Sequence, residues 1–96
     1  MRDDQAAAVA KALSNRLRIE MLRALRDRKT LSAVEYSRES GQPLGNASYH
    51  MRVLADAGVI SPSGMVQRRG AMEHRYALDG ARAKAALGVL DLLAGA

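Results

Sequence analysis

The stretch from Leu44 to Gly58 constrains the fold of this 96-residue chain more than any other part of it. Its apolar residues Ala47, Met51 and Leu54 are spaced at i, i+4 and i+7, which places them on one face of an α-helix. The stretch therefore predicts a helix with one buried face, followed by a left-handed glycine cap. A polar, basic exposed side suits such a helix to a DNA major groove, and equally to an ordinary surface position.

The composition favours one small domain that spans residues 1–96. Apolar residues make up 48% of the chain, but Phe and Trp are absent, so Leu, Val, Ile, Met and many Ala have to build a single core. Fifteen Lys and Arg against ten Asp and Glu give a net charge of +5, most of it from Arg. Because the Arg guanidinium matches phosphates and the guanine edge, this basicity favours a nucleic-acid partner.

Several classes of function are disfavoured by what the sequence lacks. The absence of Cys excludes disulfides and thiolate metal sites. No apolar stretch approaches the roughly 20 residues that cross a bilayer, and the first residues do not form a signal peptide, so we expect a cytoplasmic protein without a membrane partner. No nucleophile–base pair, phosphate-binding glycine loop or carboxylate cluster is found. We therefore predict neither catalytic residues nor a cofactor.

Two helices are predicted in the first thirty residues. Asp3 or Asp4 can cap a first helix that runs through Leu13 and is largely apolar. Ser14 or Asn15 can cap a second helix, from Arg16 to about Arg28, whose leucines and methionine have the helical period. Most of its arginines are expected to form a solvated charged face, and one or two near the helix start to contact phosphates. The arginines are Arg16, Arg18, Arg23, Arg26 and Arg28.

A helix-turn-helix is predicted over residues 32–57. Ser32 and Glu35 form a capping box for a helix from Ala33 to Ser40, which ends at Gly41. A few residues then lead into the helix described first. Two short helices joined through a glycine turn are typical of this motif. The side chains expected to face inward from the first of the two helices are Val34, Tyr36 and Ser37.

A β-hairpin, or wing, is predicted over residues 61–78. Residues 65–69 and 73–78 have the pattern of two strands around Gly70-Ala71. Residues 61–64 are expected to form a turn before the hairpin, and residues 29–31 a short connection between helices.

The last predicted helix runs from Gly80 to about Leu93, after a cap at Asp79, and is apolar around nearly its whole circumference. Such a helix has to be buried on more than one side, which a domain of this size cannot provide alone. Together with the apolar first helix, it predicts a homodimer interface made from residues 1–13 and 79–96. The alternative is a helix wrapped across its own domain.

This order of elements is mainly α with a small β-hairpin: a winged helix-turn-helix with about five helices and a two-stranded wing. Residues 12–19, Ala-Leu-Ser-Asn-Arg-Leu-Arg-Ile, resemble the opening of ArsR-type transcriptional regulators. Residues 47–54 and 57–60 are similar to that family's recognition helix, Val-Ser-x-His-Leu-x-x-Leu followed by Ala-Gly-Leu-Val. The resemblance implies a dimeric repressor that binds double-stranded DNA, with residues 44–57 in the major groove.

The resemblance also implies which residues contact DNA. On the recognition helix these are Gly45, Asn46, Ser48, Tyr49, His50 and Arg52. In the wing, on the flanking backbone or minor groove, they are Gln67, Arg68, Arg69 and Arg75. Asn46 can bond an adenine edge, and Tyr49 can reach a phosphate or a thymine methyl. Tyr49 can alternatively be a half-buried aromatic, and His50 a hydrogen-bonded structural histidine.

The chain differs from the family in the residues that bind metal. Many ArsR-type proteins bind metal through Cys, whereas this chain has none, and Glu35-Tyr36-Ser37 replaces the usual Glu-Leu-Ala. His74 beside Glu73 gives little support for a metal site without Cys, so none is predicted. An effector stays open: a small organic ligand, a partner protein or none. The alternative function is a winged-helix protein-interaction module without specific DNA binding.

Overall fold

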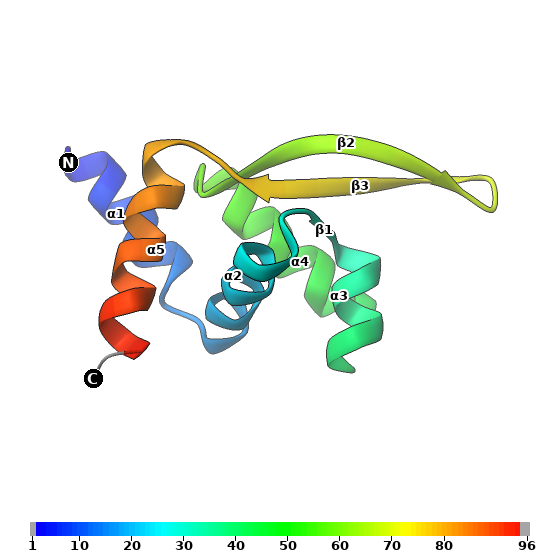
Figure 1. The fold of residues 1–96 in the computed structure, drawn as a ribbon, viewed down its shortest axis with the longest axis horizontal. Coiled ribbons are helices and arrows are strands. Elements are labelled where there is room, and N and C mark those ends of the chain that lie inside the picture. Colours follow the sequence, from blue (N-terminus) through cyan, green and yellow to red (C-terminus); the bar gives the residue numbers. More distant parts are fainter. Residues whose placement is uncertain (1, 95–96) are drawn as a thin grey trace.

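The computed structural model describes residues 2–94, which form five helices and three strands (Figure 1). Met1, Gly95 and Ala96, the outermost residues of the predicted terminal segments 1–13 and 79–96, lie outside the described residues. The elements in chain order are α1 (Asp3–Ala12), α2 (Arg16–Arg28), β1 (Leu31–Ser32), α3 (Ala33–Ser40), α4 (Leu44–Asp56), β2 (Ile60–Arg68), β3 (Ala71–Leu78) and α5 (Gly80–Ala94). The five predicted helices and the hairpin are thus confirmed.

The first two helices begin where local hydrogen bonds satisfy their free N–H groups. α1 begins after Arg2, whose backbone N–H donates to Gln5 Oε1 at 3.2 Å, so the prediction that Asp3 or Asp4 caps it is wrong. Both carboxylates lie in the first turn, where they favour the positive end of the helix dipole. α2 begins after Asn15, whose Oδ1 accepts two backbone N–H hydrogen bonds.

The helix-turn-helix follows from caps that its sequence carries. Ser32 Oγ accepts from the Glu35 backbone N–H at 3.1 Å, and Glu35 Oε1 accepts from the Ser32 N–H at 3.0 Å, which is the predicted capping box. Gly41 ends α3 at a φ of 81°, and Gly58 follows α4 at a φ of 76°. Both angles lie in the left-handed region that favours glycine.

The apolar face of α4 lies in the core, as its spacing predicts. Ala47, Met51 and Leu54 are at most 1% exposed and belong to one cluster with the buried side chains of α2. From α3, Tyr36 is buried as expected. Val34 is exposed, contrary to the prediction, because it lines an open groove between α3 and the wing.

The sheet has three strands in the order β1-β3-β2, whereas only two were predicted. Leu31 and Ser32, expected in a connection, pair antiparallel with Tyr76 and Arg75 of β3. A two-residue strand is too short for alternation to reveal it, and it forms here because β3 offers an edge beside it. The strand ties the wing to the start of α3.

Strand β2 begins at Ile60, so the turn predicted at residues 61–64 is wrong. These residues pair with β3, and the register shifts between Pro62 and Gly64. Such a bulge accommodates an extra residue and adds twist. The hairpin then runs along the 42 Å longest axis of the molecule and extends past the helices (Figure 1).

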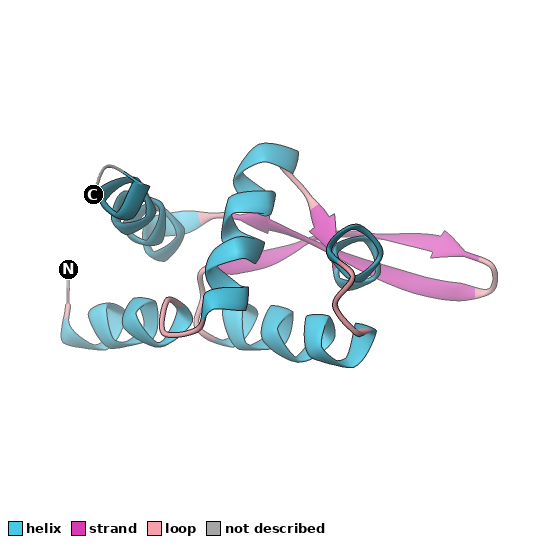
Figure 2. Ribbon diagram, turned by 90° about the horizontal axis from the view of Figure 1, so that it is seen from below, coloured by secondary structure: helices cyan, strands magenta, loops and turns pink. Residues whose placement is uncertain are grey.

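The two terminal helices, α1 and α5, pack together at the end of the molecule opposite the wing tip (Figures 1 and 2). α5 buries Ala83, Ala86 and Leu90 but leaves Leu92 76% and Leu93 49% exposed. Its apolar surface is therefore only partly covered within one chain. No helix of residues 2–94 has the length and apolar character needed to span a membrane.

A pair of methionine substitutions tests the position of α4 in the core. Met51→Ala removes a side chain that is 1% exposed and should lower the free energy of unfolding by about 2–5 kcal/mol. The matched control, Met65→Ala, removes a side chain that is 58% exposed on β2 and should change it by less than about 0.5 kcal/mol. Urea unfolding monitored by circular dichroism measures both, and equal losses would contradict the assigned core.

Candidate nucleic-acid interface

The outward face of α4 carries most of the residues predicted to contact DNA. Gly45, Asn46 and Arg52 are exposed, Ser48 is half-buried, and Tyr49 is 58% exposed rather than packed on a neighbouring helix. The opposite face is the buried stripe, so the fold turns these polar side chains to solvent. Nothing lies within 4 Å of a Cβ built on Gly45, which leaves the start of the helix open to close approach.

His50 lies at the edge of this face and is bonded within the protein. Its Nδ1 is 2.9 Å from Nη1 of Arg18, and the ring of Tyr49 meets it edge-on at 5.0 Å between centroids. Partial burial, and then the charge of Arg18, lower the pKa of His50, which favours the neutral ring that can accept this hydrogen bond. The geometry therefore favours the structural alternative for His50.

Arg18 has neither of the two roles expected for the arginines of α2, since it is neither solvated nor directed outward to a phosphate. It is 7% exposed, and its guanidinium donates to the carbonyl oxygens of Lys11 at 2.9 Å and Ala12 at 3.1 Å. Carbonyls at a helix C-terminus lack partners within the helix, so a donor from the next helix can satisfy them. Arg18 lies in the first turn of α2, three residues after the N-cap Asn15, and its position in the sequence alone does not distinguish this role from a solvated one.

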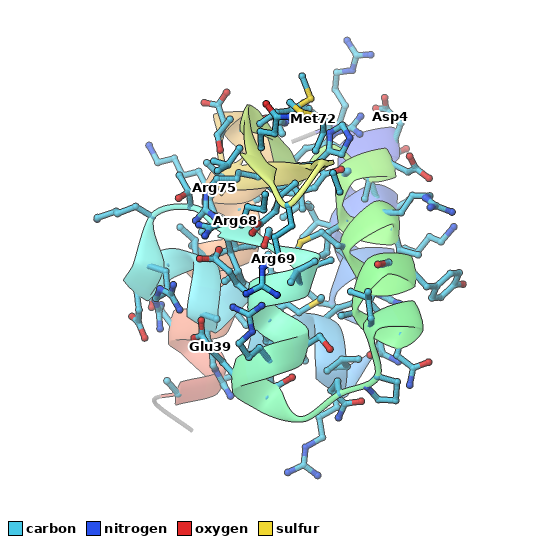
Figure 3. All side chains as sticks on the ribbon, turned by 90° about the vertical axis from the view of Figure 1, so that its right-hand side faces the viewer. Asp4, Glu39, Arg68, Arg69, Met72 and Arg75 are labelled. Carbon is cyan, nitrogen blue, oxygen red and sulfur yellow. The ribbon has the colours of Figure 1, made fainter. Side chains whose placement is uncertain are left out.

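The tip of the wing presents basic side chains. β2 ends at Arg68, and Arg69 (φ 51°) with Gly70 (φ 83°) forms the tight turn to β3. Two successive positive φ angles match the twist of a two-residue hairpin turn. Gln67, Arg68 and Arg69 are exposed, and Arg69 projects from the tip on the side of α3 (Figure 3).

Arg75, which was predicted to contact DNA, is turned into the protein instead. Its side chain is 17% exposed, and its Nη1 is 2.8 Å from Glu35 Oε1 and 3.6 Å from Glu73 Oε1. Its Nη2 donates to Thr30 Oγ1 at 2.9 Å. These contacts join β3 to α3 and to the segment before β1, so the guanidinium anchors the wing and is not directed toward a ligand.

Glu73 is the buried acid of the same cluster. Its carboxylate accepts a hydrogen bond from Ser32 Oγ and pairs with Arg75 and, at 2.7 Å, with Arg68 Nε. A buried carboxylate is tolerated only with such partners. His74, its neighbour in the sequence, is exposed, and residues 2–94 contain no group of three or more His, Cys, Asp or Glu side chains that could hold a metal ion.

One groove joins α4 to the wing. A cavity of about 260 Å³ is lined by Ser48 and Arg52 of α4, and by Met72 and His74 of β3. The side of α4 that carries Ser48 and Arg52 therefore borders the wing. Arg68 and Arg69 line a second hollow, between α3 and the wing, which shares Val34, Met72 and Glu73 with the first.

Comparison with known proteins identifies this architecture. The model of a family described as a helix-turn-helix domain matches residues 13–62. The transcriptional repressor PagR of Bacillus anthracis superposes with a TM-score of 0.70 at 17% identity, over 94% of this chain and 93% of the other. HlyU from Vibrio cholerae superposes with a TM-score of 0.70 at 22% identity, over 97% and 94%.

A third similar structure is a homodimeric winged helix-turn-helix DNA-binding domain from Mycobacterium bovis, described as a possible ArsR-family transcriptional regulator. It superposes with a TM-score of 0.68 at 22% identity, over 94% of this chain and 75% of the other. No curated protein matches the sequence. The winged helix-turn-helix fold, and its likeness to ArsR-type structures, are thereby confirmed.

Removal of Arg75 tests the anchor of the wing. Burial alone would raise the pKa of Glu35, but the Ser32 N–H and the cations Arg75 and Arg28 outweigh it and lower that pKa. A carboxyl group whose pKa is lower in the folded protein than in the unfolded chain stabilises the fold above its unfolded pKa. This stabilisation is lost as the pH falls through the folded pKa. Arg75→Ala should therefore lower the free energy of unfolding by about 1–3 kcal/mol at pH 7, and by less near pH 3.

The control is Arg26→Ala, which removes the surface ion pair to Asp91 and should cost at most about 0.5–1 kcal/mol. Urea unfolding at both pH values measures the two proteins. A cost of Arg75→Ala that is the same at pH 3 and pH 7 would contradict the charge pairing.

Proposed function

Because this chain belongs to the helix-turn-helix domain family, we propose that it is a dimeric transcriptional repressor that binds double-stranded DNA at specific sequences. In this proposal α4 enters the major groove and the wing contacts the flanking backbone or minor groove. The observation that carries it is the division of α4 into a buried apolar face and an exposed polar face of hydrogen-bonding and basic side chains. The role is a binding role without catalysis.

Sequence reading is assigned to α4. The exposed Asn46 can form two hydrogen bonds to the N6 and N7 edge of adenine, and Arg52 can bond guanine or a phosphate. Tyr49 stands on the same face at 58% exposure and can contact a phosphate or a thymine methyl. The open approach at Gly45 allows a phosphate to lie near the start of the helix.

Phosphate neutralisation is assigned to the wing. Arg68 and Arg69 stand at its exposed end, and the ion pair of Arg68 with Glu73 orders that side chain before DNA binds. Arg side chains are suited to phosphates and to a narrow minor groove. The anchor at Arg75 supports this assignment, because a wing fixed to α3 keeps its arginines at a constant distance from α4.

Dimerisation is assigned to α1 and α5. The exposed apolar side chains Val89, Leu92 and Leu93 gather on α5, next to the alanine-rich α1. A second copy would cover this surface, and two-fold symmetry would place two recognition helices about 34 Å apart on DNA. The Mycobacterium bovis domain of the same fold is homodimeric, which supports the proposal.

Two substitutions separate sequence reading from phosphate binding. On a duplex selected from a random pool, Asn46→Ala should weaken binding by about 1–3 kcal/mol and leave binding to random DNA nearly unchanged. Arg69→Ala should weaken binding to both DNAs and reduce the salt slope by about one phosphate contact. Fluorescence anisotropy titrations at several salt concentrations measure these effects.

The control for both variants is Arg23→Ala, on α2, where the arginine pairs with Glu20 outside the proposed interface. It should change neither affinity nor salt slope. Equal losses of Asn46→Ala on selected and random DNA would contradict major-groove reading. A protein for which no duplex is selected would instead fit the protein-interaction alternative.

A charge placed on α5 tests the proposed dimer. Leu92→Glu should convert the dimer to a monomer, because it introduces a carboxylate into the apolar surface that Val89, Leu92 and Leu93 form. The control Met65→Glu, at an exposed apolar residue of the wing, should remain dimeric. Sedimentation equilibrium distinguishes the two states, and a Leu92→Glu protein that stays dimeric would show that another surface is used.

A further inference from the structure

The buried guanidinium of Arg18 connects three helices. On one side it donates to the carbonyl oxygens of Lys11 and Ala12, at the end of α1, and to Ser14 Oγ at 3.3 Å. On the other side its Nη1 reaches Nδ1 of His50 on α4 at 2.9 Å. Arg18 itself lies on α2. It thus links the junction of α1 and α2 to the helix that carries the DNA-contacting side chains.

The contact between Arg18 and His50 depends on the charge of the histidine. An arginine can only donate, so Nδ1 has to be an unprotonated acceptor, with the ring proton on Nε2. Protonation places a hydrogen on Nδ1 and removes the acceptor. It also sets a second positive charge within hydrogen-bond distance of a buried guanidinium, so the two groups repel each other.

We propose that Arg18 and His50 form a pH-sensitive latch, in which neutral His50 holds α4 in the position that binds DNA and protonation of His50 releases it. His50 is then a positioning residue that acts through Arg18. This inference rests on the proposed function for its effect on DNA binding, whereas its effect on folding stability is independent of that function.

The groups around His50 allow this response. From α2 it faces Arg18, and from its own helix it faces the ring of Tyr49. The carbonyls of Lys11 and Ala12, at the end of α1, hold the far side of the guanidinium. Burial and then the charge of Arg18 lower the pKa of His50, so the folded protein disfavours its protonated form.

The direction of the pH effect follows from linkage. Because the folded state lowers the pKa of His50, the unfolded chain binds more protons between the two pKa values. The latch therefore makes its full contribution to the free energy of unfolding above the pKa of His50 in the unfolded chain, near 6.5. This contribution decreases as the pH falls from there through the lower pKa of His50 in the folded protein. DNA binding requires neutral His50 in the folded protein, so it decreases only as the pH falls through the lower, folded pKa.

The experiment compares three full-length proteins, each carrying His74→Gln because His74 is the other histidine of the chain. The first has no further change. The second carries His50→Asn, whose amide oxygen can accept from Arg18 but does not titrate. The third carries His50→Ala, which removes the acceptor. Urea unfolding, and binding to a duplex selected at pH 7.5, are measured from pH 7.5 to pH 5.0.

We expect the reference protein to bind this duplex about three- to tenfold more weakly at pH 5.0 than at pH 7.5, and to unfold more readily at the lower pH. The His50→Asn protein should match the reference at pH 7.5 and show little change with pH in either measurement. The His50→Ala protein should be weakened at both pH values in both measurements.

Three results would overturn the latch: a reference protein whose binding and stability do not change with pH, a His50→Asn protein that keeps the full pH dependence, or a His50→Ala protein that loses DNA affinity with unchanged stability. The last would make His50 a direct DNA contact. Failure of every protein to bind DNA would reject the proposed function, and the unfolding measurements alone would then decide on the latch.

Discussion

The ion pairs of Arg75 with Glu35 and Glu73 are the contacts on which the rest of the proposed DNA-binding surface depends. They hold β3, the central strand of the sheet, against α3 and thus fix the direction in which the wing leaves the helical body. Burial of charge is unfavourable by itself, and it is offset here because each carboxylate meets at least one cation and one hydrogen-bond donor. Without Arg75, the wing would still be tied to the start of α3 by the two residue pairs of β1 and β3 and by the hydrogen bond from Ser32 Oγ to Glu73.

The parts of the fold that were predictable from sequence depend on residues close together in the chain. The stripe of Ala47, Met51 and Leu54, the capping box at Ser32 and the glycine at the end of α3 each involve residues no more than eight positions apart. Helical period and capping act over this range, so the helices and the outward face of α4 could be assigned without knowledge of the tertiary structure. The basic tip of the wing could be assigned because its arginines and the turn glycine are adjacent in the sequence, at residues 68–70.

The parts that were not predictable depend on partners far along the chain. Arg18 meets His50 across 32 residues, and Arg75 meets Thr30 across 45. An arginine in an amphipathic pattern has the same local appearance whether it is solvated or satisfies buried carbonyls, so Arg18 was expected at the surface and Arg75 in contact with DNA. Strand β1 was not predicted for a related reason. Its two residues form a strand only because they pair with β3, which lies far along the chain.

Because of the bulge beside Ser63, the twist of the wing and the chemistry of its tip depend on different residues. Its extra residue sets the twist of β2 near the helical body, whereas the chemistry of the tip is set by residues 67–70 at the far end. The two segments share no residue. The direction in which this arm points and the chemical groups at its tip can therefore change independently, by a deletion at one end or a substitution at the other.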